Sequence, residues 1–231
     1  MLRAIGYDVH CIQKDGKVGV HSPIELKYGP VVDLDYVTVV GISVPGMTTK
    51  QSGQNLYSLS YFQEEKGDVV EIGTWQGRSA SFLARATHES GNGDFFAVDH
   101  FQGSSSKNGK KNFIVNEEDL SDLVDVFNDN MMRIGLSDSV TLLNMTSGQA
   151  AKKLSDRKIR FIFIDGDHSR EGVEKDIELF FPMLVDGAIV MFDDFSMRHR
   201  GLVDVLDSFL MQNKHSRVMT FGNTLVLKYK L

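Results

Sequence analysis

The sequence predicts an α/β fold with a doubly wound, mostly parallel sheet of seven strands, the last of which runs antiparallel. From Asp68 onward, short β-rich apolar runs alternate with longer segments that carry apolar residues at helical spacing. This alternation is typical of repeated β-α units. Near the end of the chain, two strand-like runs are separated only by Gly222 and Asn223, which predicts a tight hairpin and a reversal of strand direction.

Seven segments have the composition of buried strands. They are short and rich in Val, Ile, Leu and Phe, the residue types that favour strands. They cover residues 68–72, 95–98, 140–143, 161–164, 188–192, 217–221 and 224–228.

Helices are expected between these strands because apolar residues recur every three or four positions and would form one buried stripe. The expected helical segments are residues 79–87, 120–134, 148–154, 173–184 and 202–209. Gly135 directly follows the second of them and is a typical helix stop.

The beginning of the chain is less regular. We expect residues 1–60 to form an N-terminal extension that caps a core domain of residues 61–231. Within it, residues 21–44 contain short apolar runs broken by prolines and predict irregular or hairpin structure, whereas residues 50–66 predict a helix. Residues 102–113 are rich in Gly, Ser, Lys and Asn, and would form either a mobile lid or a plain surface loop.

Composition narrows the classes of function. A length of 231 residues allows one domain with a large core. The net charge of −6 argues against nucleic-acid binding, and the basic patch from Lys107 to Lys111 is short. The single cysteine, Cys11, excludes an intramolecular disulfide and fits a reducing compartment. No apolar run reaches the roughly 20 residues that span a bilayer, so we expect a cytoplasmic protein that binds no membrane.

The turn after the first strand predicts a cofactor site. Glycines at Gly73 and Gly77 let backbone N–H groups approach a ligand. Their three-residue gap differs from the G-x-G-x-x-G pattern of dinucleotide sites. Asp99 ends the second strand, where an acid can bind ribose hydroxyls, and Glu71 would suit an ammonium group. We therefore favour S-adenosylmethionine over a nicotinamide dinucleotide; the alternative is that both glycines only allow close packing.

Three acids follow two neighbouring strands of the expected sheet. Asp165 comes after the fourth strand, and Asp193 and Asp194 come after the fifth. Carboxylates at one edge of a parallel sheet can converge, and an oxygen-only site favours Mg²⁺ or another hard divalent cation. The alternative is that these acids cap helices and accept backbone amides.

If the methyl group of S-adenosylmethionine is transferred to a hydroxyl, a base must take the hydroxyl proton. Asp167 and His168 are the candidates, and we favour His168 because its ordinary pKa lies near neutrality. Asp167 could instead cap a helix that begins near Ser169.

These motifs resemble class I S-adenosylmethionine-dependent methyltransferases, and more narrowly the metal-dependent O-methyltransferases that act on sugars of macrolide and aminocoumarin antibiotics. Residues 70–79, 165–168 and 192–194 carry the resemblance, which covers roughly residues 48–195. It implies a Rossmann-like methyltransferase fold. It also implies that Glu71 and Gly73 line the methionine end of the cofactor, that Gly77 and Ser79 shape the turn and helix start, that Asp99 holds the ribose and that Ser147 contacts the adenine.

The expected function is therefore cation-assisted transfer of a methyl group to a hydroxyl of a small molecule or a sugar or glycan. An NAD-type oxidoreductase and a non-catalytic cofactor-binding scaffold are the alternatives. Similar enzymes are often homo-oligomers, so the resemblance implies one here as well.

Overall fold

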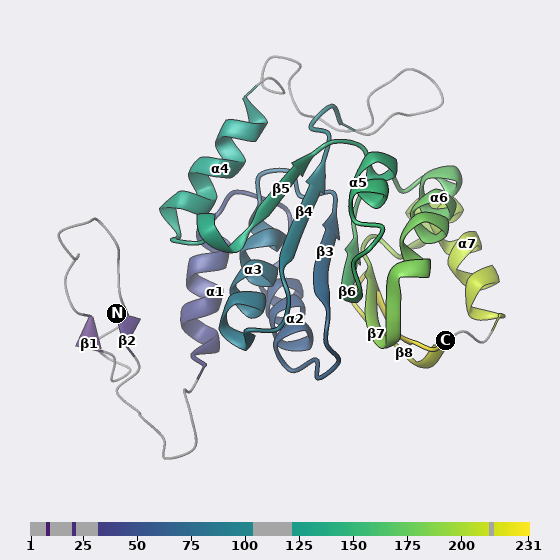
Figure 1. Cartoon of the computed structure of the whole chain (residues 1–231), viewed down its shortest axis with the longest axis horizontal. Coiled ribbons are helices and arrows are strands. Elements are labelled where there is room, and N and C mark those ends of the chain that lie inside the picture. The colour runs from purple at the N-terminus through teal and green to yellow at the C-terminus, as the bar shows by residue number, and fades with distance from the viewer. Residues whose placement is uncertain (1–7, 10–19, 22–31, 104–121, 213–214) are drawn as a thin grey trace.

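The computed structural model describes residues 8–9, 20–21, 32–103, 122–212 and 215–231 (Figure 1). Strands β1 (Asp8–Val9) and β2 (Val20–His21) form a short antiparallel pair. Cys11, the basic patch from Lys107 to Lys111 and most of the expected loop at residues 102–113 lie outside the described residues. None of the described helices is long and apolar enough to cross a membrane.

The central sheet has seven strands in the order β5-β4-β3-β6-β7-β9-β8. The strands from β3 to β7 run parallel, and β9 runs antiparallel to both of its neighbours. This confirms the doubly wound sheet with an antiparallel last strand. The strands are β3 (Asp68–Ile72), β4 (Phe95–Asp99), β5 (Thr141–Asn144), β6 (Ile159–Ile164), β7 (Leu184–Phe192), β8 (His215–Phe221) and β9 (Thr224–Tyr229).

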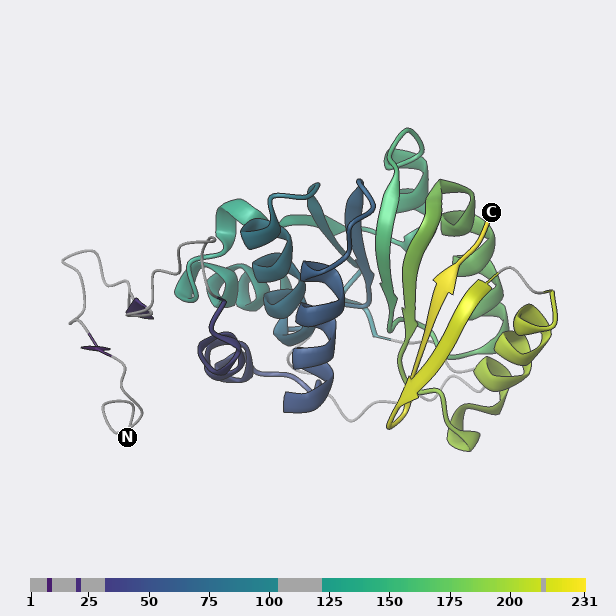
Figure 2. The same ribbon diagram turned by 90° about the horizontal axis from the view of Figure 1, so that it is seen from below.

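Helices cover both faces of the sheet (Figures 1 and 2). Alternate strand residues point to opposite faces, so Val69 packs in one apolar cluster with the first four helices and Val70 in another with the last three. The helices are α1 (Leu34–Ser43), α2 (Lys50–Tyr61), α3 (Arg78–Ser90), α4 (Leu123–Arg133), α5 (Ser147–Lys153), α6 (Arg170–Phe180) and α7 (Arg200–Leu210), with short 3₁₀ turns η2 (Ser137–Ser139), η3 (Phe181–Met183) and η4 (Met197–His199).

Helix α1 corrects the expectation of irregular or hairpin structure for the part of the segment 21–44 that it covers, Leu34–Ser43. The Asp33 carboxylate accepts hydrogen bonds from two backbone amides of the first turn and so caps the helix. Buried Gly41 lies so close to α3 that an added Cβ would sit 2.3 Å from the ring of Phe82. Packing against α3 thus stabilises a helix whose β-branched residues have poor helix propensity.

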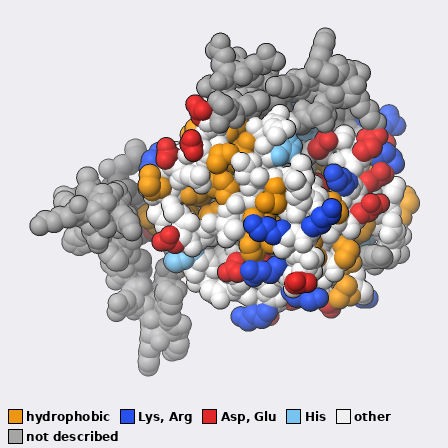
Figure 3. Space-filling view, turned by 45° about the horizontal axis from the view of Figure 1, so that its top comes forward, with side chains coloured by type: hydrophobic (Ala, Val, Ile, Leu, Met, Phe, Trp, Pro, Cys, Tyr) orange, Lys and Arg blue, Asp and Glu red, His pale blue; other side chains and the backbone are white. Residues whose placement is uncertain are grey.

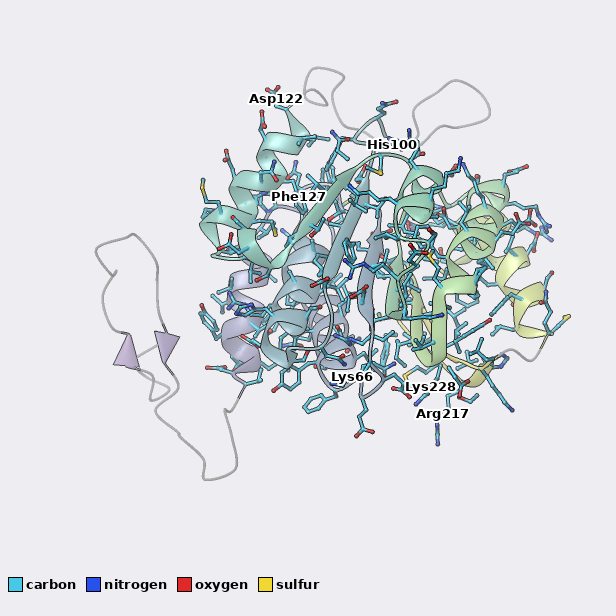
Figure 4. All side chains as sticks on the ribbon, viewed as in Figure 1. Lys66, His100, Asp122, Phe127, Arg217 and Lys228 are labelled. Atoms are coloured by element: carbon cyan, nitrogen blue, oxygen red, sulfur yellow. The ribbon has the colours of Figure 1, made fainter. Side chains whose placement is uncertain are left out.

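The carboxyl ends of β3, β4, β6 and β7 share one edge of the sheet, and the loops that follow them carry the predicted site. Figure 4 labels His100 at this edge and Lys66 at the opposite one. Among the described residues, three non-glycine residues have left-handed backbone conformations, namely Trp75, Phe101 and Asp194, and all three lie in these loops. Such conformations cost roughly 1–3 kcal/mol each and cluster at functional sites. Both acidic and basic side chains are visible on this side of the molecule (Figure 3).

Candidate functional site

Glu71 is a buried carboxylate near the end of β3 and has no exposed surface. Neither of its oxygens has a well-formed hydrogen bond to the described residues. Burial raises the pKa of Glu71 to about 8, and the nearby hydroxyls of Ser79 and Thr74 oppose that rise only in part. Because a buried acid without a partner is costly, a ligand that brings a donor group to Glu71 would relieve the cost.

Two further polar atoms of the same turn are buried without a well-formed hydrogen bond among the described residues. They are the hydroxyl of Thr74 and the indole N–H of Trp75. Buried polar groups in folded proteins are nearly always hydrogen-bonded, and exceptions call for an explanation such as a ligand. With Glu71, these atoms form a set of unused donors and acceptors after β3.

The two glycines of this turn are required by backbone conformation and by close packing. Gly73 has φ +87°, and a Cβ there would lie 2.1 Å from the backbone oxygen of Asp165. Gly77 has φ +93°, and its Cβ would press on the side chains of Met131 and Phe127. Close packing therefore explains both glycines without a cofactor, as the alternative interpretation of the sequence held. Their contacts with a cofactor stay a prediction.

Asp99 connects two loops at the sheet edge. One carboxylate oxygen accepts the backbone N–H groups of Thr74 and Trp75 at 3.0 and 2.9 Å, and the other accepts that of Phe101 at 2.7 Å. A carboxylate has about four acceptor positions, so roughly one is left for a hydroxyl. Asp99 thus holds the turn after β3 in place, and ribose binding would be an additional role.

Ser147 is the first residue of α5, directly beyond the end of β5. Its side chain hydrogen-bonds to the buried carboxylate of Asp176 on α6. Burial raises the pKa of Asp176 to about 6, although Ser147 and Lys175 oppose the rise. The structure therefore places Ser147 at the expected edge, where its hydroxyl connects α5 to α6.

His168 lies between two of the predicted acids. Its Nε2 is 3.3 Å from Oδ1 of Asp165, and its Nδ1 is 3.0 Å from Oδ2 of Asp194. Burial disfavours a charged ring, but both carboxylates outweigh it and raise the pKa of His168 to about 10. The pKa of Asp165 is also raised, by burial and by the charges of Asp193 and Asp194, while His168 opposes that rise. In the absence of another cation, the two carboxylates thus favour the protonated form of the ring.

Asp193 and Asp194 have different surroundings. Oδ1 of Asp193 accepts the hydroxyl of Thr224 on β9 at 2.8 Å, and burial raises the pKa of this acid. Asp194 has φ +54°, and contact with His168 lowers its pKa. Within the described part of the chain, three possible metal-ligand atoms lie within 4.8 Å of one another, on the side chains of His168, Asp194 and His199. This compact group contains one of the three predicted metal ligands.

His199 is the residue that sequence reasoning missed. It ends η4, and its Nε2 lies 3.4 Å from Oδ2 of Asp194. Its ring packs edge-on against that of His168, with centroids 4.8 Å apart. The only signal in the sequence was its position five residues after Asp194 in the same loop.

The Asp167 side chain stabilises the start of helix α6. Its Oδ1 accepts the backbone N–H of Ser169 at 2.9 Å, and Ser169 is the N-cap of α6. A Cβ at Gly172 would lie 2.7 Å from Cβ of Asp167, so the start of the helix packs tightly against it. This geometry matches the alternative that Asp167 caps a helix. The ring of His168 instead points toward Asp165 and Asp194.

Residues 70–195 match the protein family described as a methyltransferase domain. The fold is similar to that of the O-methyltransferase NovP, with a TM-score of 0.64 and 16% identity over 86% of this chain and 98% of that one. The calicheamicin methyltransferase CalS11 gives a TM-score of 0.58 with 14% identity, over 84% and 90%. The Bacillus cereus O-methyltransferase in complex with SAH gives 0.58 with 19% identity, over 84% and 90%.

Proposed function

This chain belongs to the methyltransferase domain family, and from that premise we propose that it transfers a methyl group from S-adenosylmethionine to a hydroxyl of a small molecule or a sugar, assisted by a divalent cation. Family membership confirms the predicted enzyme class. Three relatives of the same fold support the finer proposal by their names. NovP is an O-methyltransferase, CalS11 is a TDP-rhamnose 3'-O-methyltransferase, and the Bacillus cereus enzyme is in complex with SAH.

The observation that carries the cofactor proposal is the buried carboxylate of Glu71, which has no well-formed hydrogen bond to the described residues. S-adenosylmethionine has an ammonium group that would donate to both oxygens of Glu71. The unpaired atoms of Thr74 and Trp75 lie in the same turn and offer further polar contacts. A nicotinamide dinucleotide would bring a negatively charged pyrophosphate to this turn, next to a buried acid. The residues present therefore fit the methionine end of S-adenosylmethionine.

Methyl transfer is a one-step displacement in which an acceptor oxygen attacks the methyl carbon and the carbon–sulfur bond breaks. Positive charge leaves sulfur, and the acceptor hydroxyl gives up its proton. The chain must therefore hold donor and acceptor in line and provide a place for that proton. Strand β6 lies between β3 and β7 in the sheet. The cofactor turn and the acidic loops thus stand side by side at one edge.

We assign the cation to the edge formed by Asp165, Asp193 and Asp194. When bound, a divalent ion supplies a site for two adjacent hydroxyls and lowers the pKa of one of them. Burial and, to a smaller extent, the negative charges of Asp193 and Asp194 raise the pKa of Asp165, and a bound cation would oppose both effects. The donor set thus fits a divalent ion.

The proton acceptor is proposed to be one of the pair His168 and Asp167. His168 is favoured because it lies among the acids, but its proton is held by Asp165 and Asp194. The ring can therefore act as a base only when these carboxylates are neutralised by other partners. Asp167 has one oxygen engaged by the backbone of Ser169 and is the second candidate.

Calorimetric titration with S-adenosylhomocysteine (SAH) and with NAD tests the cofactor. We expect SAH to bind the wild type and a Glu178→Gln control, because Glu178 is exposed on α6, and to bind Glu71→Gln at least ~100-fold more weakly, a loss of roughly 2.7 kcal/mol. Binding of NAD but not SAH would favour an oxidoreductase. Binding of SAH with no transfer to any hydroxyl acceptor would favour a scaffold.

The cap of residues 1–60 on a core of residues 61–231, a homo-oligomeric state and a cytoplasmic location also remain proposals. The resemblance supports the homo-oligomer, and sedimentation of the purified chain tests it.

A further inference from the structure

We propose that His168, Asp194 and His199 form a mixed nitrogen–oxygen metal site that takes a borderline transition-metal ion such as Zn²⁺ in preference to Mg²⁺. The inference rests on the proposed cation-assisted methyl transfer and refines its donor set. The compact arrangement of these three side chains carries it, because their candidate ligand atoms all lie within 4.8 Å of one another.

The distances within the group suit a small ion. Oδ2 of Asp194 lies 3.0 Å from Nδ1 of His168 and 3.4 Å from Nε2 of His199. Around Zn²⁺, bonds of about 2.0–2.1 Å place neighbouring tetrahedral ligand atoms ~3.3 Å apart. Two of the three ligand pairs therefore already have the required spacing. An ion would enter where the three side chains face one another.

An acid lies next to the second ring nitrogen of His168, where it could orient a metal-bound ring. A histidine that binds a metal through one ring nitrogen usually donates its other N–H to a carboxylate, which fixes the ring orientation. If Nδ1 of His168 faces the ion, its buried Nε2 lies 3.3 Å from Oδ1 of Asp165 but makes no well-formed hydrogen bond to the described residues, so a small rotation of either side chain would complete the pair. Asp165 would then orient the His168 ring instead of binding the ion directly. His199 is fixed in turn by edge-on packing against the His168 ring.

The donor types determine the class of ion. Imidazole nitrogen suits Zn²⁺, Co²⁺, Ni²⁺ and Fe²⁺, whereas Mg²⁺ prefers an octahedral shell of oxygen atoms. Two imidazoles and one carboxylate leave a tetrahedral ion one open position, which is the pattern of catalytic zinc sites. One acceptor hydroxyl would fill this position, and the adjacent hydroxyl would bind by expansion of the ion to five ligands. With His168 bound to the ion, Asp167 is the remaining candidate for the base.

The test uses the full-length chain stripped of metal with a chelator and titrated with Zn²⁺ or Mg²⁺ in a calorimeter. Wild type is compared with His199→Ala and with His88→Ala, a control whose ring faces Ser139 instead. We expect Zn²⁺ to bind wild type and control at least ~100-fold more tightly than Mg²⁺. His199→Ala should lose at least ~100-fold in Zn²⁺ affinity, and Asp165→Asn about 10–100-fold.

A second measurement does not depend on any variant folding correctly. X-ray absorption of the Zn²⁺-loaded wild type should show scattering from two imidazole rings, and its absence would overturn the inference. So would unchanged Zn²⁺ affinity in a folded His199→Ala, or Mg²⁺ binding as tight as that of Zn²⁺. If one of these results came with normal SAH binding and methyl transfer, the proposed function would stand, with a cation bound by carboxylate oxygens alone. Loss of SAH binding in the wild type would instead overturn the proposed function.

Discussion

Glu71→Gln should stabilise the cofactor-free protein at alkaline pH while it removes cofactor binding. Glu71 is completely buried, and its pKa is raised from 4.5 to about 8 by that burial. The folded state therefore keeps a proton that the unfolded chain releases above about pH 4.5. For an acid of this kind, stability is fully present below the unfolded-state pKa and falls as the pH rises to the folded-state pKa.

The size of the effect follows from the two pKa values. Their difference, at ~1.4 kcal/mol per pH unit, corresponds to a loss of ~5 kcal/mol that is complete near pH 8. Glutamine carries no charge at any pH, so the variant escapes this loss. Between pH 5 and pH 8.5, we expect Glu71→Gln to gain ~4 kcal/mol in unfolding free energy relative to wild type.

Urea unfolding at both pH values measures this difference, with Glu178→Gln as a control for the loss of an exposed carboxylate. Other titrating groups are common to wild type and variant and cancel in the comparison. If wild type and Glu71→Gln lose the same stability between pH 5 and pH 8.5, then Glu71 is not a strained buried acid. The argument for an ammonium ligand at this position would fail with it.

Three further predictions concern neighbouring residues. Gly73→Ala should cost at least ~3 kcal/mol of unfolding free energy because its Cβ would lie 2.1 Å from a backbone oxygen. Gly222 has φ +55° but open space around it, so the control Gly222→Ala should cost only about 1–2 kcal/mol. Equal costs for the two variants would contradict the role of close packing at Gly73. His168→Ala should lower methyl transfer at least ~100-fold with SAH affinity retained, and full activity would exclude it from the chemistry. Asp99→Asn should cost about 1–3 kcal/mol in urea, since an amide cannot accept all three backbone donors; an unchanged stability would show that these hydrogen bonds are dispensable.

The sheet was predictable because its signals are local. Each parallel strand is a short apolar run ended by turn residues, and Gly222 with Asn223 marks the hairpin that reverses β9. Helix α1 was not predictable in the same way, because its valines, threonine and isoleucine favour strands. It is helical because Gly41 allows close approach to Phe82, a contact between residues far apart in the sequence.

In the candidate site, too, the strand ends were predictable from the sequence and the contacts between loops were not. Strand ends can be read from the sequence, so Asp165 and Asp193 could be expected after neighbouring strands, and β6 and β7 are indeed neighbours. The orientation of a ring in an irregular loop cannot be read in this way, and His199 was missed for that reason. Nor could the sequence show that Asp99 already binds three backbone amides, since these contacts depend on how the two loops fold against each other.

In the proposed enzyme, a methyl donor and a divalent ion lie side by side at one edge of the sheet. Mn²⁺ added to the protein bound to S-adenosylmethionine with a ¹³C-labelled methyl group tests it most directly, because a paramagnetic ion relaxes nearby nuclei. Strands β3 and β7 are separated only by β6, so the two sites should lie on the order of 10 Å apart. We predict that Mn²⁺ strongly relaxes the methyl signal in the wild type and leaves it unchanged in Asp194→Ala. A methyl signal unaffected by saturating Mn²⁺ would contradict the account.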